Sequence, residues 1–251
     1  FAQGELMMLG AYAVWTLTIG ADLAPWLAIP LAFVCAIVYG WLIERLFFER
    51  LVGESVFSMV MVTIGLVILI RGIVLVVWGP ADRSFPVLLP AAPLIVGDMI
   101  FPANLVLGAV LTLVVTVGMS WFFNRTRAGL TLTAVAEEPT TAISLGISVK
   151  RAVTLAWMMG SVIATAGAIV LLTGRSITVQ TADVALAALP VALLAGLESI
   201  GGLILAGAIV GIVQALVAAY IDPAIGGAAS SIVPFVFMLL ILLVRPTGLF
   251  G

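Results

Sequence analysis

Long apolar runs separated by short polar stretches dominate the sequence. Many of these runs approach or exceed the roughly 20 residues that a helix needs to cross a bilayer. The runs are continuous rather than alternating, which argues against a transmembrane β-barrel. The pattern therefore predicts an all-α, polytopic membrane protein with spans at 25–43, 56–78, 103–123, 152–172 and 230–244.

Two further apolar regions depart from this pattern. Residues 6–19 are short for a full span, and Glu5 beside Gly4 suggests a helix that begins inside the protein rather than in lipid. Residues 184–219 have the length of two short or half-length helices that meet at a non-helical break. Such breaks are tolerated at membrane depth only where protein or a cavity lines them. The interrupting residues are Pro190, Gly196, Glu198, Gly201 and Gly202.

The most polar long segment covers residues 131–147, TLTAVAEEPTTAISLGI. Its apolar residues recur at roughly helical spacing with a break in the middle. Pro139 fits the first position of a second short helix, and Glu137 and Glu138 would lie beside the positive N-terminal end of that helix. Gly146 is a plausible C-terminal stop. We therefore expect two short helical pieces on the inner face of the membrane, although an ordinary solvated loop is an alternative.

The distribution of charge predicts the orientation of the chain. The connections around 44–55, 124–151 and 245 hold most of the basic residues and are expected in the cytoplasm; these residues are Arg45, Arg50, Arg125, Arg127, Lys150, Arg151 and Arg245. The opposite connections hold only two basic residues, Arg83 and Arg175, against Asp22, Asp82, Asp98, Asp183 and Asp222. This bias places the 131–147 segment and the C-terminus inside the cell. The cluster Glu44, Arg45, Glu49, Arg50 and Glu54 is predicted to be a solvated loop, and residues 79–102, with five prolines, a long connection.

Composition narrows the function classes. Hydrophobic residues make up 64% of the chain, charged residues make up 9%, and the mean hydropathy is +1.35, which is far from the usage of soluble proteins. The absence of histidine excludes histidine-based metal sites and acid–base catalysis, and a single cysteine, Cys35, excludes an internal disulfide. There is no phosphate loop, and Lys150 is the only lysine. We expect a transporter, channel or membrane scaffold and no enzyme, with no metal, cofactor or nucleic acid bound by this chain.

Charges inside apolar segments are the sharpest local signal. A charged residue at the bilayer centre costs about 2.5–3.5 kcal/mol on insertion scales, so it normally faces protein or water. Glu5, Arg71 and Glu198 fall within or at the edges of such segments. They either line or gate a solute path or form a structural ion pair, and Arg71 has the further option of reaching the outer interface.

Five stretches of the sequence carry a family resemblance. They are FAQGELMMLGAY at 1–12, TIGL at 63–66, AVAEEPTTAISLGIS at 134–148, LLAGLESIGGLILAGAIVGIVQAL at 193–216 and RPTGLFG at 245–251. With them the chain resembles, essentially end to end, the permease subunit of bacterial branched-chain amino acid ABC importers. The family opens with one further span, which agrees with a chain that starts at Phe1 without a methionine or a basic leader. We accordingly expect the true N-terminus to be missing.

The resemblance implies a single permease domain over 1–251 in the bacterial inner membrane, working by alternating access. The implied partners are a second, related permease, a periplasmic solute-binding protein and two cytoplasmic ATPases that hold ATP and Mg²⁺. Residues 134–148 match the family's cytoplasmic coupling loop, which makes four residues expected ATPase contacts: Ala134, Glu137, Glu138 and Gly146. The expected residues of the solute path or gate are Glu5, Arg71, Gly196, Glu198 and Ser199.

Two departures from the family keep other solutes open. Glu198 stands where the family commonly has a small residue, and Gly201 stands where proline is frequent. A carboxylate there favours a ligand with an extra positive or hydrogen-bond-donating group, so urea, short amides or another amino acid remain alternatives to branched-chain amino acids. A stand-alone secondary transporter or channel and a purely structural membrane subunit are alternatives from other classes.

Overall fold

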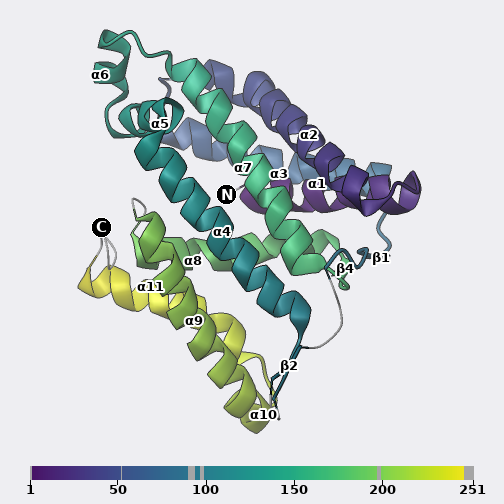
Figure 1. Cartoon of the computed structure of the whole chain (residues 1–251). Helices are drawn as coiled ribbons and strands as arrows, with labels where there is room; N and C mark the ends of the chain where they lie inside the picture. Colours follow the sequence, from purple (N-terminus) through teal and green to yellow (C-terminus); the bar gives the residue numbers. More distant parts are fainter. Residues whose placement is uncertain (1, 52, 90–93, 97–98, 197–198, 246–251) are drawn as a thin grey trace. The chain divides into compact units, whose positions relative to one another are not determined.

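The computed structural model describes residues 2–51, 53–89, 94–96, 99–196 and 199–245, and most of them are helical (Figure 1). Contacts divide the chain into two compact units. The first contains Phe1–Thr112 and Trp121–Ala182, and the second contains Leu113–Ser120 and Asp183–Gly251. Each unit is described by itself below.

Long helices and short helical turns make up most of the first unit. The longer helices are α1 (Gln3–Trp15), α2 (Pro25–Ile43), α3 (Val56–Val77), α4 (Ala103–Arg125), α5 (Arg127–Glu137) and α7 (Val149–Leu172). The shorter elements are the π-helical turns η1 (Thr16–Gly20) and η2 (Glu44–Phe48), the 3₁₀ turns η3 (Glu49–Leu51) and η4 (Val179–Asp183), and α6 (Pro139–Ser144). The middle of α4 is assigned to the second unit.

The predicted all-α, polytopic class is confirmed. Within the described residues, five helices are long and apolar enough to cross a membrane: Pro25–Leu51, Phe57–Val77, Ala103–Arg125, Val149–Leu172 and Ile200–Tyr220. Four of them correspond to the spans predicted at 25–43, 56–78, 103–123 and 152–172. Their outward faces carry many exposed large apolar side chains, as lipid or a partner subunit requires.

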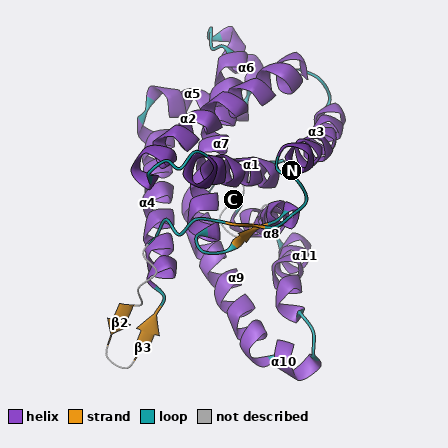
Figure 2. Ribbon diagram, turned by 90° about the vertical axis from the view of Figure 1, so that its right-hand side faces the viewer, coloured by secondary structure: helices purple, strands orange, loops and turns teal. Residues whose placement is uncertain are grey.

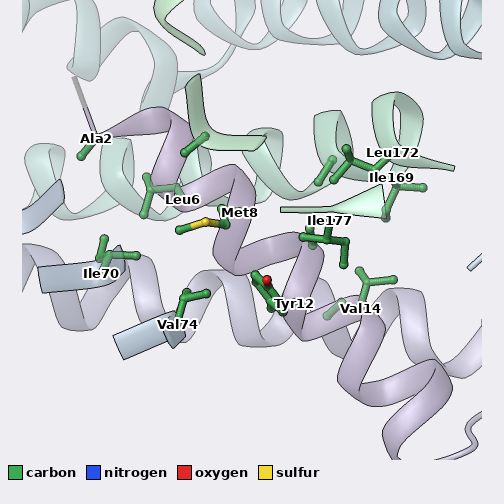
Figure 3. Close-up of a cluster of buried hydrophobic side chains, with 14 of the residues drawn as sticks. Ala2, Leu6, Met8, Tyr12, Val14, Ile70, Val74, Ile169, Leu172 and Ile177 are labelled. Atoms are coloured by element: carbon green, nitrogen blue, oxygen red, sulfur yellow. The ribbon is translucent and has the colours of Figure 1, made fainter. Parts of the chain in front are cut away.

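Helix α1 forms the core of the first unit. Its buried residues lie on all sides of the helix rather than on one stripe, which is the pattern of a helix surrounded by protein. It packs against α7, α2 and α3. Figure 3 shows Leu6, Met8 and Tyr12 of α1 between side chains of α3 and α7. This short apolar segment is therefore an internal helix whose neighbours shield it from lipid.

Two glycines let α7 approach α1 and α2 closely. A Cβ added to Gly10 of α1 would lie 2.9 Å from Cα of Thr165, and one added to Gly40 of α2 would lie 2.9 Å from the Trp157 carbonyl oxygen. The Tyr39 hydroxyl donates to the Leu6 carbonyl oxygen at 3.1 Å and lies 2.8 Å from Thr165 Oγ1. Small residues and hydrogen bonds, which drive helix association in lipid, thus join the three helices.

A short sheet joins distant parts of the first unit. Strand β1 (Arg83–Ser84) pairs antiparallel with β4 (Ser176–Ile177), which follows α7. The guanidinium of Arg83 lies 4.4 Å from the centre of the Trp15 ring and donates through Nη2 to the Trp78 carbonyl oxygen. These contacts fasten the connection after α3 to the end of α1.

The long connection before α4 contains a second pair of strands. β2 (Leu94–Val96) and β3 (Met99–Phe101) form an antiparallel pair in which Ile95 lies opposite Ile100 (Figure 2). The sequence, with five prolines over 79–102, predicted a long connection and no strands were expected from it. Both strand pairs are therefore findings of the structure.

The predicted solvated loop after α2 is wrong for its first half. The helix continues through η2 and η3, and Glu44 is 2% exposed. Phe48 stacks on Trp157 of α7 with ring centres 4.4 Å apart, which holds this turn against the protein. The charged residues near Glu44 led to the prediction of a solvated loop. The Phe48–Trp157 contact instead holds this stretch against α7.

The second unit contains α8 (Val184–Ala195), α9 (Ile200–Tyr220), α10 (Asp222–Ile225), η5 (Ala229–Ile232) and α11 (Val233–Val244). Its core is made by Leu194, Ala195, Ala206, Val210 and Val233. The predicted break within 184–219 is confirmed, because α8 ends at Ala195 and α9 starts at Ile200. The prediction of two short or half-length helices is wrong for α9, which has 21 residues and is long enough to cross a membrane.

The turn between α9 and α11 is fixed by an acidic side chain. Asp222 accepts hydrogen bonds from the hydroxyl of Ser230 at 2.6 Å and from the backbone N–H of Ser230 at 3.0 Å. These bonds, led by the one from the hydroxyl, lower the pKa of Asp222, because they stabilise its charged form.

The Gly10 contact leads to a stability prediction. Gly10→Ala should lower the free energy of unfolding by about 1–3 kcal/mol, because the added methyl group meets the backbone of α7. Thermal unfolding of the purified protein in mild detergent would measure the change.

The matched control is Gly167→Ala on α7. A Cβ at Gly167 meets nothing within 4 Å, so this variant should unfold at or slightly above the wild-type temperature, since alanine favours the helix. Equal losses for the two variants would contradict the predicted role of the Gly10 contact.

Candidate functional site

The polar segment at 131–147 is held between two capped helix ends. The Thr126 hydroxyl accepts a hydrogen bond from the Gly129 N–H at 3.0 Å and caps the start of α5. The Ser148 hydroxyl accepts from the Arg151 N–H and caps the start of α7. Each cap satisfies an N–H group that has no partner within its helix. The segment is therefore anchored to α4 on one side and to α7 on the other.

The two predicted helical pieces are confirmed, with an earlier start. α5 begins at Arg127 rather than at Thr131, and it ends at Glu137. Pro139 occupies the first turn of α6 as predicted. Gly146 has a φ of +81°, a left-handed conformation that favours glycine. The Ile147 N–H then closes onto the Ala142 carbonyl oxygen at 2.9 Å, which ends α6 and turns the chain toward α7.

Both short helices are packed against the rest of the first unit. α5 and α6 lie together at one end of α7 (Figure 1). Leu132 of α5 and Ala142 of α6 are buried, and Gly129 lies so close to α4 that an added Cβ would be 2.6 Å from Cα of Phe123. A hollow of about 340 Å³ between α5, the Gly146 turn and the start of α7 includes Arg151 among its lining residues.

The outward face of this segment combines acidic and apolar side chains. Of the residues predicted to contact an ATPase, Glu137, Glu138 and Gly146 are exposed, and Ala134 is half-buried. Ile143 and Leu145 were not among them, although they are 59% and 74% exposed. Their apolar character was visible in the sequence, but their outward orientation was not.

An ion pair joins α1 and α3 within the first unit. The Arg71 Nε donates to Glu5 Oε1 at 2.9 Å. The Glu5 side chain is only 3% exposed, whereas that of Arg71 is 33% exposed. Removing one partner of such a pair leaves an uncompensated buried charge. The structure thus brings together two of the residues that the sequence singled out for the solute path.

The remaining predicted path residues lie at the helix break in the second unit. Gly196 has a φ of +88°, and the Ser199 N–H donates to the Gly196 carbonyl oxygen at 3.1 Å. The Ser199 hydroxyl caps α9 by accepting from the Gly202 N–H at 3.0 Å. Glu198, the third predicted residue here, lies outside the described residues. The described residues on either side of the break are therefore joined by the Gly196–Ser199 hydrogen bond, and the Ser199 side chain caps the start of α9.

Metal chemistry has no visible site in the described part of the chain. There, no three side chains of histidine, cysteine, aspartate or glutamate come together in a way that would hold a metal ion. The ordered features available for function are the α5–α6 segment, the Glu5–Arg71 pair and the break between α8 and α9.

Comparisons with known proteins agree in one description. A family model described as the permease component of the branched-chain amino acid transport system matches residues 1–242. Two relatives are named high-affinity branched-chain amino acid transport system permease proteins: LivH of Escherichia coli K12 and BraD of Pseudomonas aeruginosa, each 28% identical to this chain. Both alignments cover all of this chain and 85% of the relative. No solved structure matches the chain.

The left-handed turn at Gly146 gives a prediction for the α5–α6 segment. Gly146→Ala should destabilise the turn by about 1–2 kcal/mol, because a Cβ opposes this conformation. Faster hydrogen exchange of the amides over 139–147 would report the loss, with exchange in α2 unchanged.

Gly146→Asn is the matched control, since asparagine tolerates left-handed backbone better than alanine. Its exchange should fall between that of the wild type and that of Gly146→Ala. If the alanine variant exchanges as slowly as the wild type, the conformation of Gly146 does not hold this turn.

Proposed function

The chain belongs to the family of permease components of branched-chain amino acid transport systems, and we propose that it carries these amino acids across the bacterial inner membrane by alternating access, driven by ATP. The observation that carries this proposal is the family match over residues 1–242, supported by relatives that align with the whole chain. The five span-length helices fit the same role.

The α5–α6 segment is the surface on which we place an ATPase partner. Glu137 and Glu138 supply negative charge. Ile143 and Leu145 supply aliphatic side chains that are exposed to solvent. Burying such a side chain contributes roughly 1.5–3 kcal/mol. An apolar centre with a polar rim is the usual composition of a protein interface. The complete importer would add a second ATPase, a second permease and a periplasmic binding protein.

The packing of the segment offers a route for movement. α6 continues through the Gly146 turn into α7, which packs along both α1 and α2. Gly10 lies at the α1–α7 contact and Gly40 lies at the α2–α7 contact. Neither position has room for an added Cβ. A displacement of α6 is therefore passed to α7, and from α7 to the core of the first unit. We propose that closure of the ATPases moves the helices in this order.

Two alternatives stay open because they share these features. Urea or a short amide would use a permease of the same design, with a different solute path. A stand-alone transporter or channel would move its solute without ATP, and the exposed α5–α6 surface would then have no partner.

The first test is to identify the proteins that co-purify with this chain in gentle detergent, by mass spectrometry. We expect two ATPases and a related permease. The assembled complex, reconstituted with its binding protein, should then take up leucine with ATP and not urea. Purification of the chain alone, together with solute flux without ATP, would overturn the importer proposal.

The proposed ATPase surface has its own prediction. The double variant Glu137→Lys/Glu138→Lys should uncouple ATP hydrolysis from leucine uptake, because it reverses two charges beside the apolar anchors. Leu145→Asp should have the same effect, since it removes an anchor. The ratio of transported leucine to hydrolysed ATP in proteoliposomes measures both variants.

Glu54→Lys is the control, because it reverses an exposed charge on the connection before α3 and should leave that ratio unchanged. If Glu137→Lys/Glu138→Lys and Leu145→Asp both keep full coupling of ATP hydrolysis to leucine uptake, α5 and α6 do not form the ATPase surface.

A further inference from the structure

The hollow between α5 and the start of α7 combines an aliphatic lining with one cation. Its volume of about 340 Å³ lies in the range of small-molecule sites. Leu132 and Ala152 line it and are buried, while Ile147 and Leu155 line it and are half-buried. Arg151 is exposed and is the only charged residue among the described residues that line the hollow. Mostly apolar walls with a few polar groups are typical of ligand sites.

The charge of Arg151 is not compensated within the described part of the chain. There, no carboxylate pairs with its guanidinium, whereas the neighbouring Lys150 pairs with Glu49 at 3.4 Å. Arg151 also lies in the first turn of α7, where the helix dipole adds positive potential. A carboxylate suits such a position, because it binds a guanidinium through short, charge-assisted hydrogen bonds, often two in parallel.

A hydroxyl group adds a second polar contact to the hollow. Thr131 lines it and donates its hydroxyl hydrogen to the Arg127 carbonyl oxygen at 2.7 Å. Toward a ligand, the Thr131 oxygen is therefore left as an acceptor, which suits an ammonium group. A cation, an acceptor and aliphatic walls together match an amino acid that has an aliphatic side chain.

We propose that this hollow binds a branched-chain amino acid on the cytoplasmic side, after transport, and that its occupancy slows further uptake. Arg151 binds the α-carboxylate, Thr131 accepts from the ammonium group, and Leu132 and Leu155 contact the side chain. The inference rests on the proposed function, and it adds regulation of the permease by the transported product.

The place of the hollow explains how occupancy acts on transport. Its lining comes from α5, from the turn at Gly146 and from the start of α7, which are the elements that pass on a displacement of α6 in the proposed function. A ligand that contacts α5 and α7 together favours the arrangement in which both contacts exist. Because a ligand shifts an equilibrium toward the state that it binds more tightly, the bound amino acid opposes the movement.

Photolabelling of the assembled permease–ATPase complex in detergent tests the site directly. Photo-leucine, a diazirine analogue of leucine, should crosslink to α5 and to the start of α7, and excess leucine should prevent this. Arg151→Gln should reduce this labelling about tenfold at a subsaturating probe concentration, since a charge-assisted hydrogen bond is lost. Labelling of Arg151→Gln at the wild-type level, or no labelling of these two helices, would overturn the proposal.

The effect on transport is measured in proteoliposomes that enclose ATP and unlabelled leucine. Internal leucine should slow the ATP-driven uptake of labelled leucine by the wild-type complex. Each variant is compared with its own rate without internal leucine. On that scale, Arg151→Gln should need about tenfold more internal leucine for half-inhibition. The control is Arg127→Gln, an exposed arginine of α5 that is not among the lining residues, and it should be inhibited like the wild type.

Other occupants and other routes of inhibition give different results. Equal inhibition of the wild type and Arg151→Gln would mean that internal leucine acts through the solute path, and it would overturn the regulatory role. Protection of the hollow by anionic phospholipid and not by leucine would assign it to a lipid headgroup. Uncoupled ATP hydrolysis in Arg151→Gln without any photolabelling of the wild-type hollow would assign it to an ATPase side chain. Both assignments would overturn the proposal.

The proposed function fails in a different way. If the wild-type complex with its binding protein takes up no leucine with ATP, the importer proposal is overturned. Photolabelling in detergent does not depend on uptake, so it reports on the amino acid site separately.

Discussion

The close contact between α1 and α7 is the interaction on which the first unit depends. α1 is buried on all sides, and its burial comes from the helices that pack against it. Gly10 allows the two backbones to approach, and the Tyr39 hydroxyl ties α2 into the same junction. In lipid, where apolar packing gains nothing from water, such contacts supply much of the association between helices. The α5–α6 segment is covalently continuous with α7, one of the two helices of this junction.

Two ion pairs of the protein show how burial changes the energetic contribution of an ion pair. Glu49 and Lys150 meet at 3.4 Å on an exposed face, where water and salt reduce the attraction to little. Glu5 and Arg71 meet at 2.9 Å inside the helical unit, where neither charge is stable without a partner. Charged residues at membrane depth normally pair with one another or face a water-filled cavity.

The sequence predicted the features whose cause is local. The predicted spans at 25–43 and 56–78 begin where α2 and α3 begin, and Gly146 and Gly196 mark turns because few other residues adopt their backbone. Contacts between distant residues could not be read in the same way. The burial of Glu44 depends on an aromatic stack with α7, and the outward orientation of Ile143 and Leu145 depends on which side of α6 packs inward. Of the proposed path, the sequence identified Glu5 and Arg71 separately; only the fold joins them.

The pairing of β1 with β4 has a consequence for biosynthesis. Arg83 and Ile177 are partners in this sheet, and the chain between them contains α4, α5, α6 and α7. A ribosome releases Arg83 long before Ile177, so the sheet cannot form until the chain that contains these helices has been synthesised. The entropy of closing so long a loop is moderate, but the event is necessarily late. The sheet therefore closes late, and it joins the connection after α3 to the end of α7 only when both have been made.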